Sequence, residues 1–292
     1  GLGDVYKRQV GGSWQWQPHN QYHVKAGARG LSWAGSQPES MSDYRAKIDS
    51  VKQPYVSHET GQWCAFPNFS EIRKYTGVNK AKNFEIFRDI LNDNHMGSMG
   101  HDFMMASGKL QAICYKHEIE KTLRTPDYAG FQLLALNDYS GQGTALVGLL
   151  DVFFEEKGYI NADEFRRFCS PTVPLARIPK FVYTNDETFH ADIEVSHFGA
   201  APLQGAKTVY SIKDEYGKVY AHGTVGTQDI PVGNLCQLGS VDMKLNGITT
   251  PQKLNMEIRI EGSNAINDWD FWVYPAQVEL CLLYTSPSPR DA

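Results

Sequence analysis

A carboxylate stands at the end of a short apolar run in the first quarter of the chain. Tyr55 and Val56 have the character of a strand in a parallel sheet, and Ser57, His58 and Glu59 follow them directly. In barrels built of alternating strands and helices, side chains at the carboxyl ends of the strands carry the chemistry. Glu59 is therefore a candidate nucleophile, general acid or general base. The alternative is an ordinary solvated carboxylate at the start of a surface loop.

Two further segments carry side chains that could recognise a polar ligand. Trp14, Trp16 and His23 lie in a stretch rich in aromatic and hydrogen-bonding groups, which could line a pocket or pack as ordinary core or lid residues. Asn137 and Asp138 follow an apolar run, where they could bind hydroxyl groups or simply form a turn. Both interpretations stay open for each segment.

The sequence predicts neither a metal site nor a cofactor site. His19 and His23 have the spacing of a helical metal pair, but Pro18 precedes them and no helical period surrounds them. The cysteines form no C-x-x-C pair, which argues against structural zinc. Buried free thiols are the default expectation, and disulfides stay open. The cysteines outside the C-terminal tail are Cys64, Cys114, Cys169 and Cys236.

The composition is that of an ordinary globular protein. Of the 292 residues, 41% are hydrophobic and 21% are charged. No apolar run reaches the length of a membrane helix, so no membrane span is expected. The formal net charge is −5 and the basic residues do not cluster, which makes nucleic acid an unexpected partner.

The chain divides into two halves with different hydrophobic periods. Helical patterns alternate with short apolar runs over residues 12–179, whereas strand patterns dominate residues 180–280. In the first half, helices are predicted over 79–94, 101–124 and 161–170, a strand over 128–136, and a short helix with Ser42 as its N-cap. The apolar faces expected on the two longer helices contain Phe84, Phe87, Ile90 and Leu91, and Leu110, Ile113, Cys114 and His117.

The second half alternates with the period of half-buried strands. Ala191, Ile193 and Val195 fall on one face, and residues 214–217 read as a hairpin connection. About 100 residues with many short strands are typical of an immunoglobulin-like sandwich. No titratable cluster is visible there, so a structural role is expected for this half.

Six motifs are distributed over most of the chain: SHETGQWC at 57–64, PNFSEI at 67–72, KYTG at 74–77, GFQLL at 130–134, NDYSGQGTA at 137–145 and NDWDFWVYP at 267–275. Together they resemble glycoside hydrolase family 2, and in particular its multidomain bacterial members of the β-galactosidase type. This resemblance implies the C-terminal part of a (β/α)8 TIM barrel over residues 12–179, followed by the sandwich over 180–280.

The resemblance implies retaining cleavage of terminal β-glycosidic bonds, with a β-galactoside as the favoured substrate and Glu59 as the nucleophile. A retaining mechanism needs a second carboxyl group as acid/base. In the family this Glu follows an Asn, and the chain contains no Asn-Glu dipeptide. The acid/base is therefore expected to be missing, and the isolated chain inactive. The residues assigned to substrate binding are His58, Trp14, Trp16, His23, Trp63, Asn137 and Asp138.

The implied partner is an oligosaccharide or a polysaccharide-derived glycoside, the implied location is periplasmic or secreted, and no cofactor is implied. A rival interpretation is a non-catalytic carbohydrate-binding or structural module, in which Trp14, Trp16 and Trp63 would form a stacking platform. A hydrolase of esters or amides is a weaker rival, because no nucleophile–base pair is recognisable.

The two ends of the chain resemble translated sequencing-adapter DNA. Residues 1–11 and 281–292 are accordingly interpreted as non-native sequence, and the natural part as an interior fragment of a longer protein. The alternative is a pair of natural disordered tails.

Overall fold

The computed structural model describes residues 14–15, 23–25, 28–31, 33, 35–51, 54–143 and 145–277. Trp16 and the two segments interpreted as non-native lie outside these residues. For Trp14 and His23 only the backbone is described. The predictions on these side chains and segments therefore stay predictions.

The first half contains a four-stranded sheet in the order β1-β2-β3-β4. The strands are β1 (Trp14–Gln15), β2 (His23–Lys25), β3 (Tyr55–Thr60) and β4 (Tyr128–Leu133). Strands β2, β3 and β4 run parallel, whereas β1 pairs with β2 in the antiparallel sense. The carboxyl ends of β3 and β4 therefore lie at the same edge of the sheet.

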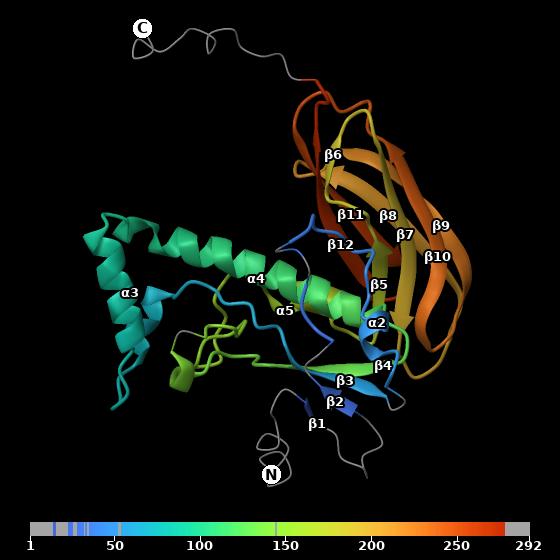
Figure 1. The fold of residues 1–292 in the computed structure, drawn as a ribbon. Helices are drawn as coiled ribbons and strands as arrows, with labels where there is room; N and C mark the ends of the chain where they lie inside the picture. The colour runs from blue at the N-terminus through green and yellow to red at the C-terminus, as the bar shows by residue number, and fades with distance from the viewer. Residues whose placement is uncertain are drawn as a thin grey trace, which may run out of the picture.

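Two helices lie between β3 and β4 in the chain, α3 (Lys82–Asp93) and the long α4 (Gly100–Leu123). In Figure 1, α4 runs along β3 and β4 toward the strand-rich half, and α3 stands at its far end. The shorter helical elements are α2 (Arg45–Ile48), η1 (Phe69–Lys74), η2 (Gly97–Met99), η3 (Ser140–Gln142) and α5 (Ala162–Phe168).

The predicted part of a (β/α)8 barrel is wrong. Each strand of such a barrel is parallel to its neighbours and is followed by one helix. Here two helices separate β3 from β4, and the β1–β2 pair is antiparallel. The molecule is mostly sheet.

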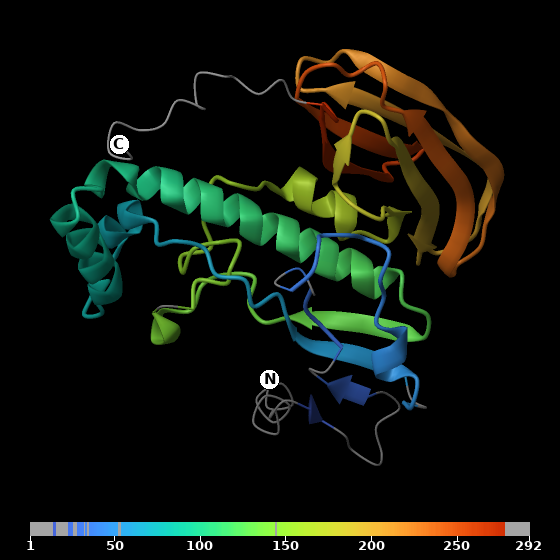
Figure 2. The ribbon, with the colours of Figure 1, turned by 45° about the horizontal axis from the view of Figure 1, so that its top comes forward.

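The second half consists of two sheets that face each other across a common apolar core (Figure 2). The three-stranded sheet has the order β10-β7-β5 and the five-stranded sheet the order β6-β12-β11-β8-β9. Phe189 of the first sheet stacks on Phe271 of the second, with ring centroids 4.1 Å apart. The strands are β5 (Thr172–Arg177), β6 (Val182–Thr184), β7 (Thr188–His197), β8 (Leu203–Asp214), β9 (Val219–Ile230), β10 (Gly233–Lys244), β11 (Gln252–Ile260) and β12 (Ile266–Tyr274).

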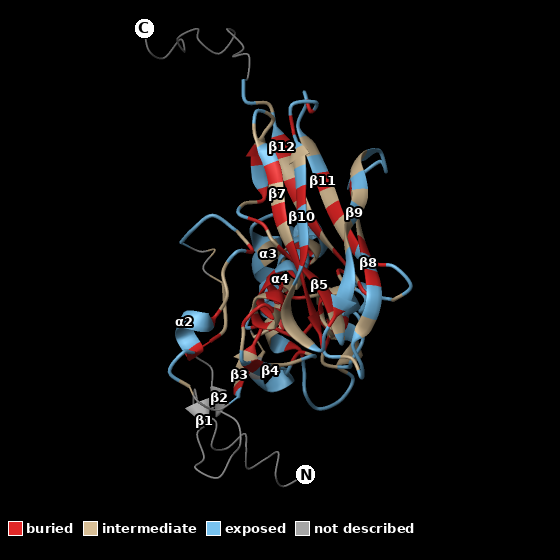
Figure 3. Cartoon of the chain, turned by 90° about the vertical axis from the view of Figure 1, so that its right-hand side faces the viewer, coloured by how far each residue is buried: buried red, intermediate tan, exposed pale blue. Residues whose placement is uncertain are grey.

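Alternation along the strands produces this core. Ala191, Ile193 and Val195 of β7 are fully buried, as their spacing predicts. Figure 3 shows buried segments between the sheets and exposed segments on the outer strands. The predicted hairpin connection is present, with the Gly217 amide donating to the Asp214 carbonyl at 3.0 Å.

The three predicted helices are present, but parts of their expected apolar faces are not buried. Phe84 is buried, whereas Ile90 is 54% exposed because no described element covers that side of α3. On α4, Cys114 and His117 are buried while Leu110 is 58% exposed. The remaining exposed members of the two expected faces are Phe87 and Ile113.

Side-chain hydrogen bonds at the N-termini of α5 and α2 determine where these helices begin. Asn161 forms a capping box with Glu164 at the start of α5. The prediction of Ser42 as an N-cap is wrong, because α2 begins at Arg45 and the Ser42 hydroxyl donates to Glu39 instead.

All four cysteines among the described residues are free thiols. Cys114 is buried as expected, but Cys64 is exposed. No helix in the described part of the chain is long and apolar enough to cross a membrane.

Candidate functional site

Glu59 lies at a β-bulge near the carboxyl end of β3. The strand pairs with β4 through Ser57 and Phe131, and next through Thr60 and Leu133, so β3 carries one extra residue in this interval. Glu59 takes a left-handed backbone conformation there, with φ of 56°. A bulge redirects the side chains beside it, which explains how two neighbours in sequence approach one another. His58 Nε2 lies 3.8 Å from Glu59 Oε1.

Arg29 provides the positive charge next to Glu59. Its Nη1 atom donates to the His58 carbonyl at 3.1 Å and to the Glu59 carbonyl, and it lies 3.4 Å from Glu59 Oε2. The Gln62 amide donates to the same carboxylate oxygen at 3.3 Å. Glu59 Oε1 accepts no hydrogen bond from the described residues. One oxygen is thus held while the other stays available, and the side chain is 36% exposed.

A second carboxylate, Glu118 of α4, lines the same hollow. It is 1% exposed. Its Oε1 atom accepts from the Gly30 amide at 2.6 Å, and its Oε2 atom accepts from Trp63 Nε1 at 2.8 Å. Burial raises the pKa of Glu118, although these donors and the charge of Arg29 oppose the shift. Because both oxygens are occupied, Glu118 fixes the indole of Trp63 and the backbone next to Arg29.

These groups surround one small hollow of about 220 Å³. It brings together two carboxylates, one guanidinium, one carboxamide and one indole, which suits a ligand rich in hydroxyl groups. The residues that line it are Arg29, Gly30, Glu59, Gln62, Trp63 and Glu118.

Three other predicted site residues whose side chains the structure describes, His58, Asn137 and Asp138, do not line this hollow. His58 lies beside Glu59, but its Nδ1 atom is 3.0 Å from Gln132 Oε1 and the residue does not line the hollow. Asp138 is buried, accepts from the Gly148 amide at 2.9 Å and forms an ion pair with Lys157 at 2.6 Å. Burial raises the pKa of Asp138 against the charge of Lys157. Asn137 donates to the carbonyl of Asp138.

Sequence reasoning missed four residues of the hollow: Gly30 and the three polar residues Arg29, Gln62 and Glu118. Gln62 follows Glu59 by three residues, and this closeness is a usable signal. Arg29 and Glu118 are separated from Glu59 by 30 and 59 positions, so only the tertiary fold reveals them. A charged residue on an otherwise buried helix face is the one signal that could have indicated Glu118.

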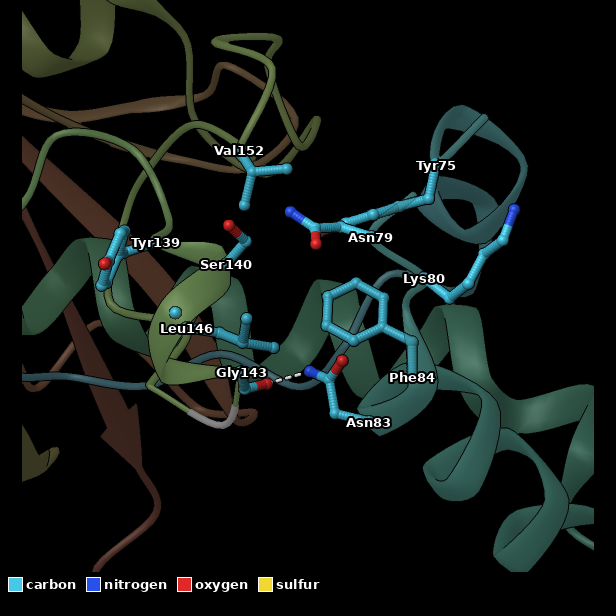
Figure 4. Close-up of a pocket in the computed structure, with 11 residues that line it drawn as sticks. Tyr75, Asn79, Lys80, Asn83, Phe84, Tyr139, Ser140, Gly143, Leu146 and Val152 are labelled. Carbon is cyan, nitrogen blue, oxygen red and sulfur yellow. Dashed lines mark hydrogen bonds between the residues drawn. The ribbon is translucent and has the colours of Figure 1, made fainter. Parts of the chain in front are cut away.

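A second and larger pocket, of about 370 Å³, lies between the segment before α3 and the loop after β4 (Figure 4). Asn83 donates to the carbonyl of Gly143 and joins the two walls. The lining residues are Tyr75, Asn79, Lys80, Asn83, Phe84, Tyr139, Ser140, Gly141, Gly143, Leu146 and Val152. Among the residues that the structure describes, no three His, Cys, Asp or Glu side chains are arranged to hold a metal ion.

Comparison with models of known protein families matches part of the chain. Residues 187–275 match the model of a family described as a domain of unknown function (DUF8488). This segment is less than half of the chain and contains none of the residues that line either hollow. No curated protein matches the sequence.

The structural neighbours include glycosidases at low similarity. An exo-chitosanase, CsxA of Amycolatopsis orientalis, is 15% identical with a TM-score of 0.41, over 65% of this chain and 21% of its own. A β-glucuronidase of Parabacteroides merdae is 14% identical with a TM-score of 0.27, over 35% of this chain and 14% of its own.

A CARDB domain of a Pyrococcus furiosus protein, in complex with di-metal ions, is 13% identical with a TM-score of 0.26, over 36% of this chain and 93% of its own. The chain spans only about a fifth or less of the length of the exo-chitosanase and of the β-glucuronidase. At these TM-scores the likeness carries no conclusion about activity.

Proposed function

We propose that this chain carries the nucleophile, Glu59, of a retaining β-glycosidase of glycoside hydrolase family 2. One observation carries the proposal: Glu59 opens into a hollow with one carboxylate oxygen held by Arg29 and Gln62 and the other free. A nucleophile needs both features, since it must be positioned and must still reach the anomeric carbon. The motif around Glu59 supports the same assignment and favours a β-galactoside.

In this mechanism the free Glu59 oxygen attacks the anomeric carbon of the sugar while the glycosidic C–O bond breaks. A general acid protonates the departing oxygen, and water later releases the sugar from Glu59. Glu118 does not suit the acid role, because the Gly30 and Trp63 N–H groups occupy both of its oxygens. We therefore assign the acid/base to a residue outside this chain.

Trp63 suits a sugar-stacking role. Aromatic rings pack against the apolar faces of ligands while their polar edges find partners. Glu118 holds the indole N–H of Trp63 and so fixes the ring before a ligand arrives. Such preorganisation lowers the entropic cost of binding.

A glycosyl fluoride tests the nucleophile without the missing acid, because fluoride leaves without protonation. With 2-deoxy-2-fluoro-β-galactosyl fluoride, Glu59 attacks C1, the C1–F bond breaks, and a stable glycosyl ester remains on the carboxylate. We expect mass spectrometry of the digested protein to place the adduct on Glu59. Glu59→Gln should abolish the adduct, and Glu85→Gln, which replaces a surface carboxylate paired with Lys82, should preserve it.

The same reagent in its gluco, manno and glucurono forms covers the other sugars. An adduct on a different carboxylate, or no adduct with any of the four, would refute Glu59 as the nucleophile.

A non-catalytic carbohydrate-binding module is the second candidate. It is favoured by the fact that Glu59 is the one carboxylate of the hollow with a free oxygen, so one half of the catalytic pair is missing. This candidate predicts saturable oligosaccharide binding that survives Glu59→Ala, together with no covalent labelling.

A further inference from the structure

The outer side of α3 carries apolar side chains that face water. Ile86 is 56% exposed, Ile90 is 54% exposed, and Phe87 beside them is 37% exposed. The helix packs on the protein through a different side, which contains the buried Phe84. In Figures 1 and 2, α3 stands at the end of the molecule farthest from the strand-rich half, and no described element covers its outer side. Neighbouring exposed apolar side chains of this kind indicate a contact with another surface.

The charges at the two ends of α3 oppose the helix dipole. Lys82 is the first residue of the helix, Asp93 is the last, and the last turn contains no basic residue. Lys82 pairs with Glu85 at 2.5 Å but keeps 74% of its side chain exposed. Asp93 makes no hydrogen bond or ion pair with a residue that the structure describes. A helix favours the reverse arrangement, with anions at its start and cations at its end, so this order of charges brings α3 no local benefit.

The apolar and the charged side chains share one side of the helix. Lys82, Ile86, Ile90 and Asp93 follow one another at spacings of four, four and three residues, which places them along one stripe. The two isoleucines thus lie between a positive end and a negative end. A second copy of the same stripe, running antiparallel, would bring each negative end beside a positive end and would also oppose the two helix dipoles.

The spacing fits a two-fold axis. Ile86 and Ile90 are equally distant from residue 88, near the middle of the twelve-residue helix. An axis at residue 88 places Ile86 opposite the partner's Ile90, and it places Lys82 within one residue of the partner's Asp93. Asp89, the other acidic residue near the axis, is paired with Arg88 at 3.1 Å, which compensates its charge. A surface that is complementary to itself in this way is what a two-fold dimer requires.

We propose that the Ile86–Ile90 side of α3 is a self-association surface, through which two copies of this chain pair with their α3 helices antiparallel. An interface formed through one short helix is small, and small interfaces belong to weak and transient complexes. We therefore expect a dimer that is populated only at protein concentrations of about 0.1 mM and above. The proposal does not depend on the proposed glycosidase function.

Sedimentation velocity of the full chain tests the association. The protein is measured between about 0.01 and 0.5 mM, a range that brackets a weak equilibrium. A reducing agent is present, because the exposed thiol of Cys64 could otherwise link two copies covalently. We expect the average mass to rise toward that of a dimer. Asp93→Lys and Lys82→Asp each place like charges together at both ends of the helix pair, and each should weaken the association about tenfold.

Combining the two substitutions tests the antiparallel arrangement. In the double variant Lys82→Asp/Asp93→Lys opposite charges meet again, so the association should recover. An equimolar mixture of the two single variants should form a mixed dimer for the same reason. Both substitutions agree with the helix dipole and should leave α3 folded. The matched control is Asp49→Lys, which makes the same charge change at an exposed position at the end of α2 and should associate like the parent.

Three outcomes overturn the proposal. The first is a parent chain that stays monomeric over the whole range, which would leave this side of α3 to a different partner. The second is a dimer that forms equally well in Asp93→Lys and in the Asp49→Lys control, because its contact would then lie elsewhere. The third is a double variant that melts like the parent but does not recover the association, which would exclude the antiparallel arrangement.

Discussion

Replacing Glu120 by alanine tests whether one buried carboxylate fixes the long helix α4 to the strand-rich half. Glu120 is fully buried, and its oxygens accept from Asn267 Nδ2 at 2.8 Å and from Trp269 Nε1 at 3.0 Å, both on β12. It also pairs with Lys116 and, at 3.4 Å, with Arg124. The variant removes the carboxylate that these two cations and two N–H donors share.

The magnitude follows from the charges around the carboxylate. Burial alone would raise the pKa of Glu120, but the charges of Lys116, His117 and Arg124 lower it to about 2 from the ordinary 4.5. A shift of this size corresponds to roughly 3 kcal/mol. Removing one partner of a buried ion pair typically costs about 3–5 kcal/mol. We therefore expect Glu120→Ala to lose about 3 kcal/mol or more, and roughly 10 °C in Tm.

The pH dependence has a defined sign. Because the pKa of Glu120 is lower in the folded protein, its contribution is complete above pH 4.5 and is lost as the pH falls through about 2. The difference between parent and variant should therefore shrink in acid.

Urea denaturation at pH 7 and at lower pH measures both effects. Glu85→Ala is the control, because Glu85 pairs with Lys82 on the surface and should change stability by less than about 1 kcal/mol. A loss in Glu120→Ala no larger than in this control would show that the network contributes nothing to docking of the helix.

Two further predictions concern the core of the first half. Glu71 is 1% exposed, and neither of its oxygens is hydrogen-bonded to a residue that the structure describes. Burial, followed by the charge of Asp151, raises the pKa of Glu71 to about 7. The contribution of Glu71 to the unfolding free energy is therefore complete below about pH 4.5 and is lost as the pH rises through about 7. We expect Glu71→Gln to flatten the fall in unfolding free energy between pH 5 and 8, measured by urea midpoints. An unchanged dependence on pH would contradict this. Gly61 has φ of 83°, and a Cβ there would lie 2.0 Å from the ring of Tyr115. Gly61→Ala should cost about 2–4 kcal/mol in unfolding free energy, whereas Gly77→Ala, at an open position, should be nearly neutral; equal effects would refute the steric argument.

Local sequence patterns predicted the helices and strands better than they predicted which faces of these elements are buried. The period of two over residues 190–198 identifies β7 and its buried face, since each inward side chain meets a second sheet. The helical period over 79–94 identifies α3, but not that Ile90 would stay exposed. A period shows which residues share a face, and only the tertiary fold shows whether another element covers it.

The arrangement of the first half could not be predicted for the same reason. An apolar run that ends in polar residues is compatible with any parallel strand, and nothing local in residues 55–60 states how many strands lie beside it. The resemblance implied the C-terminal part of a (β/α)8 barrel, in which all strands are parallel, whereas β1 pairs with β2 in the antiparallel sense. Local sequence patterns do not show which strands, distant in the sequence, pair with one another.

Four carboxylates of the first half, Glu59, Glu118, Glu120 and Asp138, differ in what occupies their oxygens, and this difference separates structure from chemistry. Glu118 and Glu120 each have both oxygens engaged by donors, so each holds neighbouring segments in place. Asp138 is committed to Lys157 and to the Gly148 amide. Glu59 alone of these four has a free oxygen that opens into a hollow, on a backbone that the bulge redirects. A group that can still form a new bond is the one to test for covalent chemistry, because the others would first have to break the contacts that fold the protein.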